Sequence, residues 1–293
     1  MSLLVLLSLA AGGCFSLLAI VYKTAERRQC RAIPFAFAFV LVAGTLALLS
    51  NGFQTSAWSA APLWVLGIAM GCMHAGGIIL INQVNRLGPA YISWTVINLS
   101  LLLPILASAI LLQEHLVKLD AFVLLLFVIM LLLFNVGMRG LQHGGKRLSP
   151  RFALFLVCLW TLNGLFLFGN KLKYSYFGDN FSAELALIFY WAGGLAIVLL
   201  SLVLHQPFWP NRSERSVGFA AGFVSVAGLL MMQKAMSLPS AMVFPLIQGM
   251  SLVGGVVLTQ LVFRESVNRY TLLGISCGVA ILLLAVWREQ LMF

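Results

Sequence analysis

The chain has 293 residues, of which 61% are hydrophobic and only 9% are charged. Soluble domains contain about 25% charged residues and keep a polar exterior, so this composition excludes an ordinary soluble protein. The net charge of +10 does not indicate a nucleic-acid-binding protein, because the 18 Lys and Arg residues lie in short segments between apolar runs.

A helix that crosses a membrane needs about 20 mainly apolar residues. The first such run lacks the basic start and the shorter apolar core of a cleavable signal peptide, so we expect it to be a membrane span. The sequence thus predicts an all-α integral membrane protein with ten transmembrane helices. In chain order the predicted spans are 3–22, 32–49, 62–84, 90–113, 121–138, 152–174, 184–204, 217–236, 241–263 and 270–287.

The segments between these spans are short and polar, as in KTAERRQCR at 23–31 and QPFWPNRSER at 206–215. None is long enough to form a soluble domain, so we expect binding to occur inside the helix bundle. The five cysteines are scattered and include no CxxC pair, a pattern that predicts neither a disulfide framework nor a zinc site.

An internal repeat appears when the sequence is shifted by 151 residues. The shift places Glu114 on Glu265 and aligns three pairs of glycines. These pairs are Gly67 with Gly218, Gly71 with Gly222, and Gly77 with Gly228. We therefore predict two repeats, 1–148 and 149–293. With five spans each, the second copy enters the membrane in the opposite direction, which is the inverted-repeat plan of secondary transporters.

The aligned glycines form small-xxx-small motifs, GIAMG at 67–71 and GFAAG at 218–222. A third motif, GISCG, lies at 274–278. Such motifs let helix backbones approach each other closely in lipid. We expect these glycines to serve helix packing rather than ligand binding.

The sequence resembles the drug/metabolite transporter superfamily, in its ten-helix EamA-like branch. The residues that carry the resemblance are LGPAYISWTVINLSLLLPILASAILLQEHL at 87–116 and LPSAMVFPLIQGMSLVGGVVLTQLVFRESV at 238–267. The resemblance implies a multi-pass protein of the cell (inner) membrane, a monomer or homodimer, without cofactor. It also implies that helices 1, 3, 4, 6, 8 and 9 surround a cavity and that helices 5 and 10 lie outside it. Family members move amino acids, other metabolites, drugs or activated sugars.

All eight carboxylates lie in loops or at the ends of spans. A carrier that couples to protons through a carboxylate needs one inside the membrane, so exchange or facilitated movement is favoured and a metal site is not expected. Glu114 and Glu265 are interpreted as turn or helix-cap groups. The apolar span at 121–138 is interpreted as a lipid-facing helix.

Neutral polar residues lie near the middle of several spans and are the candidate substrate-binding residues. His74, Asn98, Asn163 and Gln248 could contact a solute or bond across helices. Trp94 and Trp160 could form an aromatic wall or serve packing. Lys171 could capture an anionic group, although snorkelling of its side chain to the interface is the favoured interpretation.

Two prolines, Pro104 and Pro245, lie inside predicted spans, where each frees a backbone carbonyl and permits a kink. Our hypothesis is that these bends let the central helices gate the cavity. Replacing both with Ala should then slow transport more than it weakens binding.

The orientation is left open by two conflicting indications. Segments on one side of the predicted spans hold 13 Lys and Arg residues and those on the other side hold 5, so the positive-inside rule places both termini outside. Relatives in the EamA-like branch are usually described with both termini in the cytoplasm.

The sequence favours a secondary transporter or exporter of a small organic metabolite, amino-acid-like or similar. The alternatives are a lipid-linked sugar carrier or flippase subunit, which would need a lateral opening for an acyl chain, and a multidrug exporter. An intramembrane enzyme is disfavoured, because such enzymes need convergent catalytic groups inside the membrane. The expected partners are the solute and the lipid bilayer, with no nucleic acid.

Overall fold

The computed structural model describes residues 2–51, 61–87, 90–139, 150–263 and 268–291. Over these ranges the chain forms eleven α-helices and no β-strand. The helices are α1 (Leu3–Arg27), α2 (Ala32–Asn51), α3 (Ala61–Leu87), α4 (Ala90–Leu99), α5 (Leu102–Leu111), α6 (Lys118–Arg139), α7 (Pro150–Phe177), α8 (Ser182–Val203), α9 (Arg212–Ala235), α10 (Ser240–Phe263) and α11 (Arg269–Leu291).

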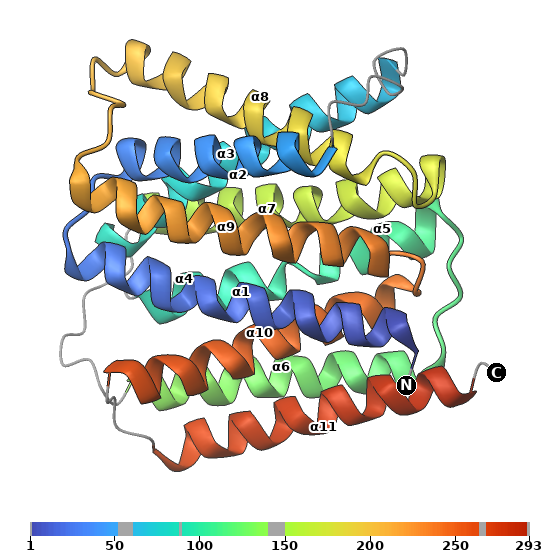
Figure 1. Ribbon diagram of the computed structural model, residues 1–293. Coiled ribbons are helices and arrows are strands. Elements are labelled where there is room, and N and C mark those ends of the chain that lie inside the picture. The colour runs from blue at the N-terminus through green and yellow to red at the C-terminus, as the bar shows by residue number, and fades with distance from the viewer. Residues whose placement is uncertain (1, 52–60, 88–89, 140–149, 264–267, 292–293) are drawn as a thin grey trace.

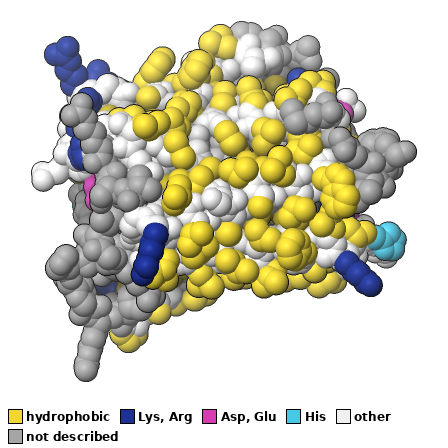
Figure 2. All heavy atoms as spheres, turned by 90° about the horizontal axis from the view of Figure 1, so that it is seen from below, with side chains coloured by type: hydrophobic (Ala, Val, Ile, Leu, Met, Phe, Trp, Pro, Cys, Tyr) yellow, Lys and Arg dark blue, Asp and Glu magenta, His cyan; other side chains and the backbone are white. Residues whose placement is uncertain are grey.

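Nine of the described helices are long and apolar enough to cross a membrane. The helices run side by side, and the start of α1 and the end of α11 lie at the same end of the bundle (Figure 1). Hydrophobic side chains cover the middle of the face shown in Figure 2, whereas Lys and Arg side chains lie toward its two ends. The chain is a helical, multi-pass membrane protein.

The predicted span 90–113 is not one helix but two short ones, α4 and α5, which are separated by Ser100 and Leu101. Pro104 is the third residue of α5. In a straight helix its ring would collide with the Ser100 carbonyl, four residues earlier. Here that carbonyl accepts a hydrogen bond from the Leu103 amide at 3.1 Å. The α-helical hydrogen bonding is therefore interrupted near Pro104 over two residues, which turn hydrogen bonds from Leu101 to Asn98 and from Leu103 to Ser100 bridge.

Close packing between the helices rests on the predicted glycine motifs. Gly71 of α3 lies against the main-chain carbonyl of Phe189 in α8, and Gly222 of α9 lies against that of Phe39 in α2. A side chain at either glycine would collide with the facing carbonyl. The backbones can approach so closely only because these positions lack a Cβ atom.

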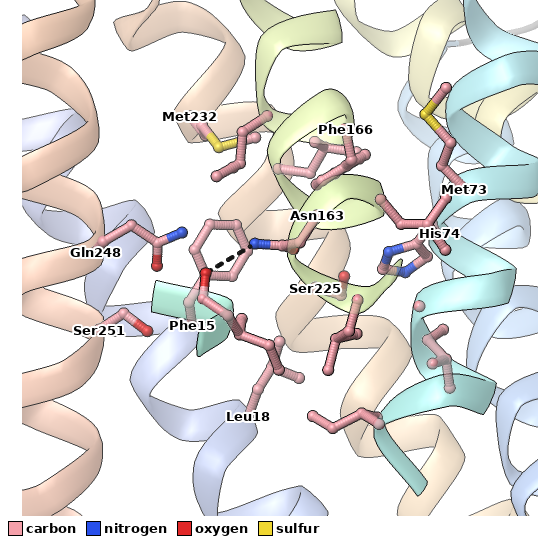
Figure 3. A pocket seen from close by; sticks show the side chains of 18 of the residues that line it. Phe15, Leu18, Met73, His74, Asn163, Phe166, Ser225, Met232, Gln248 and Ser251 are labelled. Carbon is pink, nitrogen blue, oxygen red and sulfur yellow. Dashed lines mark hydrogen bonds between the residues drawn. The ribbon is translucent and has the colours of Figure 1, made fainter. Parts of the chain in front are cut away.

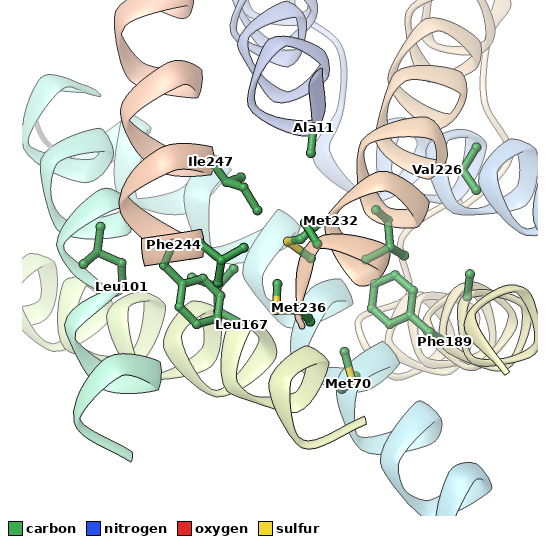
Figure 4. Packing of buried hydrophobic residues seen from close by; sticks show 14 of the residues in the cluster. Ala11, Met70, Leu101, Leu167, Phe189, Val226, Met232, Met236, Phe244 and Ile247 are labelled. Atoms are coloured by element: carbon green, nitrogen blue, oxygen red, sulfur yellow. The ribbon is translucent and has the colours of Figure 1, made fainter. Parts of the chain in front are cut away.

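The buried hydrophobic core takes most of its residues from α2, α8, α9 and α10, with further ones from α3 and from one face of α6 (Figure 4). All seven residues of the segment 241–247 in α10 are buried. By contrast, α6 exposes one face through residues such as Leu125 and Leu132 and packs with the other against α11. The interpretation of 121–138 as a lipid-facing helix agrees with this placement.

Three described ion pairs join residues before position 140 to residues after position 149. Arg31 contacts Glu214 at 2.9 Å, Lys171 contacts Glu114 at 2.6 Å, and Arg288 contacts Asp120 at 2.6 Å. The hydrogen bonds to the Glu214 carboxylate raise the pKa of the Arg31 guanidinium, which lies just before α2. The two parts of the chain are thus connected by charge as well as by apolar packing.

Candidate functional site

A cavity of about 170 Å³ lies between α1, α3, α4, α7, α8, α9 and α10. His74 of α3, Asn163 of α7 and Gln248 of α10 are among the side chains that line it. In Figure 3 these three side chains point into the same space, with His74 and Gln248 on opposite sides. The structure therefore brings three of the candidate residues together around one cavity.

His74 lies in a box of aromatic rings. Its imidazole centroid is 5.0 Å from Phe189, 5.4 Å from Phe166 and 5.6 Å from Phe39. The Nε2 atom of the imidazole is buried and has no hydrogen-bond partner among the described residues. An unpaired buried nitrogen is unfavourable, so a solute that reached Nε2 by displacing a neighbouring ring would restore a lost interaction.

Asn163 lines the cavity and also forms hydrogen bonds to the region between α4 and α5. Its Nδ2 atom donates to the Ile97 carbonyl at 3.2 Å and to the Ser100 hydroxyl at 2.6 Å. These groups belong to the end of α4 and the break that follows it, where the regular helical bonding stops. Asn163 thus adds hydrogen bonds to two groups at the interruption, where the Ile97 carbonyl also accepts from the Ser100 hydroxyl at 2.6 Å.

Gln248 and Ser251 stand one turn apart on α10 and both face the cavity. Among the described residues the Gln248 amide has no hydrogen-bond partner. Ser225 of α9, which the shift of 151 residues places on His74, also lines the cavity and shares a hydrogen bond of 2.9 Å with the Tyr190 hydroxyl. Gln248 is therefore free to bond to a solute, whereas Ser225 is already paired.

Other candidates lie away from the cavity. Asn98 is buried in α4 without lining it, and its neighbour Ile97 takes that place. Trp160 of α7 is half-buried outside the lining. The side chain of Trp94 lies outside the described part of the structure. Pro104 and Pro245 are also absent from the lining.

Lys171 neither lines the cavity nor snorkels to an interface. Its side chain is only 5% exposed and forms the ion pair with Glu114. Its Nζ atom also donates to the carbonyls of Met236 and Leu238, at 3.0 and 2.8 Å. The expectation that Lys171 could capture an anionic solute is therefore not supported by its position, because its charge is already paired.

Glu114 acts as the predicted cap, but on a helix far away in the sequence. Its Oε2 atom accepts a hydrogen bond of 2.8 Å from the amide of Ser240, the first residue of α10. A carboxylate at a helix N-terminus satisfies a free amide and the helix dipole. The aligned residue Glu265 lies outside the described residues.

Sequence reasoning missed most of the aromatic lining. Phe15, Leu18 and Tyr22 of α1 line the cavity at spacings of three and seven residues, which puts them on one helical face. Phe166 lies three residues after Asn163 and also lines it. Helical spacing from the predicted polar residues could have found Phe166, whereas nothing polar marks the face of α1.

The comparisons with known proteins identify the fold but no function. No protein-family description and no curated relative matches this chain. Among solved structures 27 chains match. One of them, described only as a crystal structure of a protein, is 18% identical, covers 99% of both chains and has a TM-score of 0.74. At this identity the likeness shows the fold alone.

Proposed function

We propose that this protein is a secondary transporter of the drug/metabolite transporter superfamily, which moves a small organic metabolite across the cell membrane by alternating access. The observation that carries the proposal is the cavity between helices of both parts of the chain, lined by His74, Asn163 and Gln248. Secondary transporters bind their solutes near the midplane, at the interface of two repeats.

The contacts between helices support two inverted repeats. In the proposed repeats α1 corresponds to α7, α2 to α8, and α3 to α9. The observed packing of α1 against α9 then has its counterpart in α3 against α7, and α2 against α9 has its counterpart in α3 against α8. Self-matched pairs, α2 with α8 and α6 with α11, also pack together. This pattern is the one expected from a two-fold axis that exchanges the repeats.

A count of ten crossings is supported by the two ends of the chain. Since the start of α1 and the end of α11 lie at the same end of the bundle (Figure 1), the chain makes an even number of passes. Nine long helices alone would give an odd number. Taking α4 and α5 together as one interrupted span supplies the tenth pass. Interrupted helices are a recurring feature of transporter binding sites.

The size of the cavity favours a small solute over a drug. Its volume of about 170 Å³ is below the range of about 300–1,000 Å³ for pockets that hold drug-sized ligands. We therefore favour a metabolite carrier over a multidrug exporter.

The proposal can be tested with a variant that fills the cavity. Gly77 lines the cavity, and a Cβ atom at this position would meet nothing within 4 Å. Gly77→Leu should therefore fold and occupy the solute space. Gly13→Leu is the matched control, because Gly13 is also in a helix with nothing within 4 Å of its added Cβ but does not line the cavity.

The measurement uses proteoliposomes loaded with a small-molecule cell extract, with released compounds identified by mass spectrometry. The wild-type protein and Gly13→Leu should release at least one compound that protein-free liposomes retain, and Gly77→Leu should not. If Gly77→Leu releases the same compounds at the same rate, solutes do not pass through this cavity and the proposal fails.

A further inference from the structure

We infer that the solute of this cavity is a small, uncharged, ring-containing molecule with hydrogen-bonding groups toward two sides of the ring, about the size of a single heteroaromatic amide. This inference rests on the proposed function and names the chemical class of its solute. It draws on the charge, the aromatic surface and the unpaired polar atoms of the cavity.

The described lining of the cavity offers no opposite charge to an ionic solute. None of the described residues that line the cavity is Asp, Glu, Lys or Arg. Lys171, the buried cation on the same helix as Asn163, is neutralised by Glu114. A carboxylate or an ammonium group entering this cavity would lose its water without gaining an opposite charge, which is strongly unfavourable.

The aromatic lining fits a flat solute. Phe15, Tyr22, Phe166 and Tyr190 all line the cavity. Tyr190 also lies near His74, with ring centroids 6.2 Å apart. Aromatic side chains bind other rings through offset stacking and edge contacts. Such rings could also attract a cation, but without a carboxylate among the described lining residues they replace only part of its lost hydration.

The unpaired polar atoms lie on two sides of this aromatic space. His74 lines the cavity with its Nε2 atom buried behind the cavity surface and without a described partner, and the Gln248 amide is unpaired on the opposite side (Figure 3). A solute therefore bonds to Nε2 only after a small shift of the imidazole or of a neighbouring ring. A neutral imidazole nitrogen can donate or accept according to its tautomer, and an amide does both. A ring with a nitrogen on one side and a carboxamide on the other can bond to both groups at once.

A charge-matched series tests the inference on the full-length protein purified in detergent. Nicotinamide is uncharged, nicotinate is an anion and 1-methylnicotinamide is a cation, while all three keep the same six-membered ring. Binding is measured by equilibrium dialysis of each labelled compound, since this readout does not depend on transport. We expect nicotinamide to bind and both ions to bind at least about tenfold more weakly, because each ion leaves its charge unpaired.

Two variants locate the bonds. His74→Phe keeps a ring in the aromatic box, and Gln248→Met keeps a side chain of similar length, but each removes the polar atoms. Each should weaken nicotinamide binding by about fivefold, as expected for one lost hydrogen bond. The control Gln83→Met, at an exposed position of α3 away from the cavity, should bind as the wild type does.

The outcomes separate this inference from the proposed function. Tighter binding of nicotinate or 1-methylnicotinamide than of nicotinamide, abolished by Gly77→Leu, would overturn the uncharged class and leave the carrier proposal standing. Failure of all three compounds to bind would also overturn the inferred class, while the release experiment still decides the transport proposal. Nicotinamide binding that persists in Gly77→Leu would place the site elsewhere and overturn the inference.

Discussion

The segments Ala90–Leu111 and Ser240–Phe263 are aligned by the repeat, yet the first is broken and the second is continuous. Each contains one proline. Pro104 lies in the first turn of α5, where helix amides have no intrahelical partner in any case, so a new helix can begin there. Pro245 is the sixth residue of α10, which continues through it to Phe263. One proline is thus accommodated in the first turn of a helix and the other inside a continuous helix.

The two segments differ in the side chains that bond to their backbone. Around residues 97–100, the Asn163 amide and the Ser100 hydroxyl both donate to the Ile97 carbonyl, and Asn163 also bonds to Ser100. On the other side of the cavity, α10 continues through Pro245, and the Gln248 amide has no partner among the described residues. One wall of the cavity is thus held by internal hydrogen bonds, whereas the other presents a free amide.

The largest loss of stability is expected from Lys171→Met. This variant removes the cation that joins the segment after α5 to the segment before α10. The Glu114 carboxylate, 20% exposed, would remain without its partner. Breaking a buried ion pair in this way lowers the free energy of unfolding by about 3 kcal/mol. The measurement is thermal melting of the purified protein, with Lys234→Met at an exposed position of α9 as the control.

The double variant Lys171→Met with Glu114→Gln should recover most of this loss, because no buried charge is then left unpaired. Equal melting temperatures for the single and double variants would show that the ion pair does not hold these segments.

A second test compares two aligned glycines. A Cβ atom at Gly228 would lie 2.6 Å from the ring of Phe15, whereas one at Gly77 meets nothing within 4 Å. Gly228→Leu should therefore lower the free energy of unfolding by about 1–3 kcal/mol through overpacking. Gly77→Leu should melt at or above the wild-type temperature, since leucine favours helix more than glycine does. Equal losses of unfolding free energy in both variants would show that the position of Gly77 has no free space for a side chain.

A smaller difference in the free energy of unfolding is expected between Asn163→Leu and Gln248→Leu. The first removes two hydrogen bonds at the helix break and should lower the free energy of unfolding by about 1 kcal/mol, since Ser100 keeps its own bond to the Ile97 carbonyl. The second removes an amide without a described protein partner and should leave the melting temperature unchanged. A larger loss in Gln248→Leu would reverse the assignment of the two cavity walls.

Substitution of the prolines should change the stability least, but it should change the rate of solute release measurably. Pro104→Ala lets α4 and α5 join into one helix, whereas Pro245→Ala changes a helix that is already continuous. We expect both to alter the free energy of unfolding by less than about 1 kcal/mol, and Pro104→Ala to slow release from proteoliposomes more than it weakens binding. Unchanged release kinetics in the double variant would discard the gating hypothesis.

The sequence predicts much of this architecture, because apolar runs and short polar breaks depend on neighbouring residues only. It places His74, Asn163 and Gln248 at mid-span, and the structure finds them at one cavity. It cannot pair Lys171 with Glu114, since that contact depends on how α7 packs against distant segments. The two-residue interruption after Leu99 also escapes prediction, because Pro104 alone is compatible with a bent helix.

The three ion pairs that cross between the two parts of the chain bear on how such a protein could have arisen. Arg31, Glu114 and Asp120 each have an opposite charge that belongs to the second part. A homodimer assembled from two copies of residues 1–148 would contain these side chains twice and their present counterparts not at all. If the two parts arose by duplication and fusion, their charges have since diverged, so that two copies of the first part could not form the same three ion pairs.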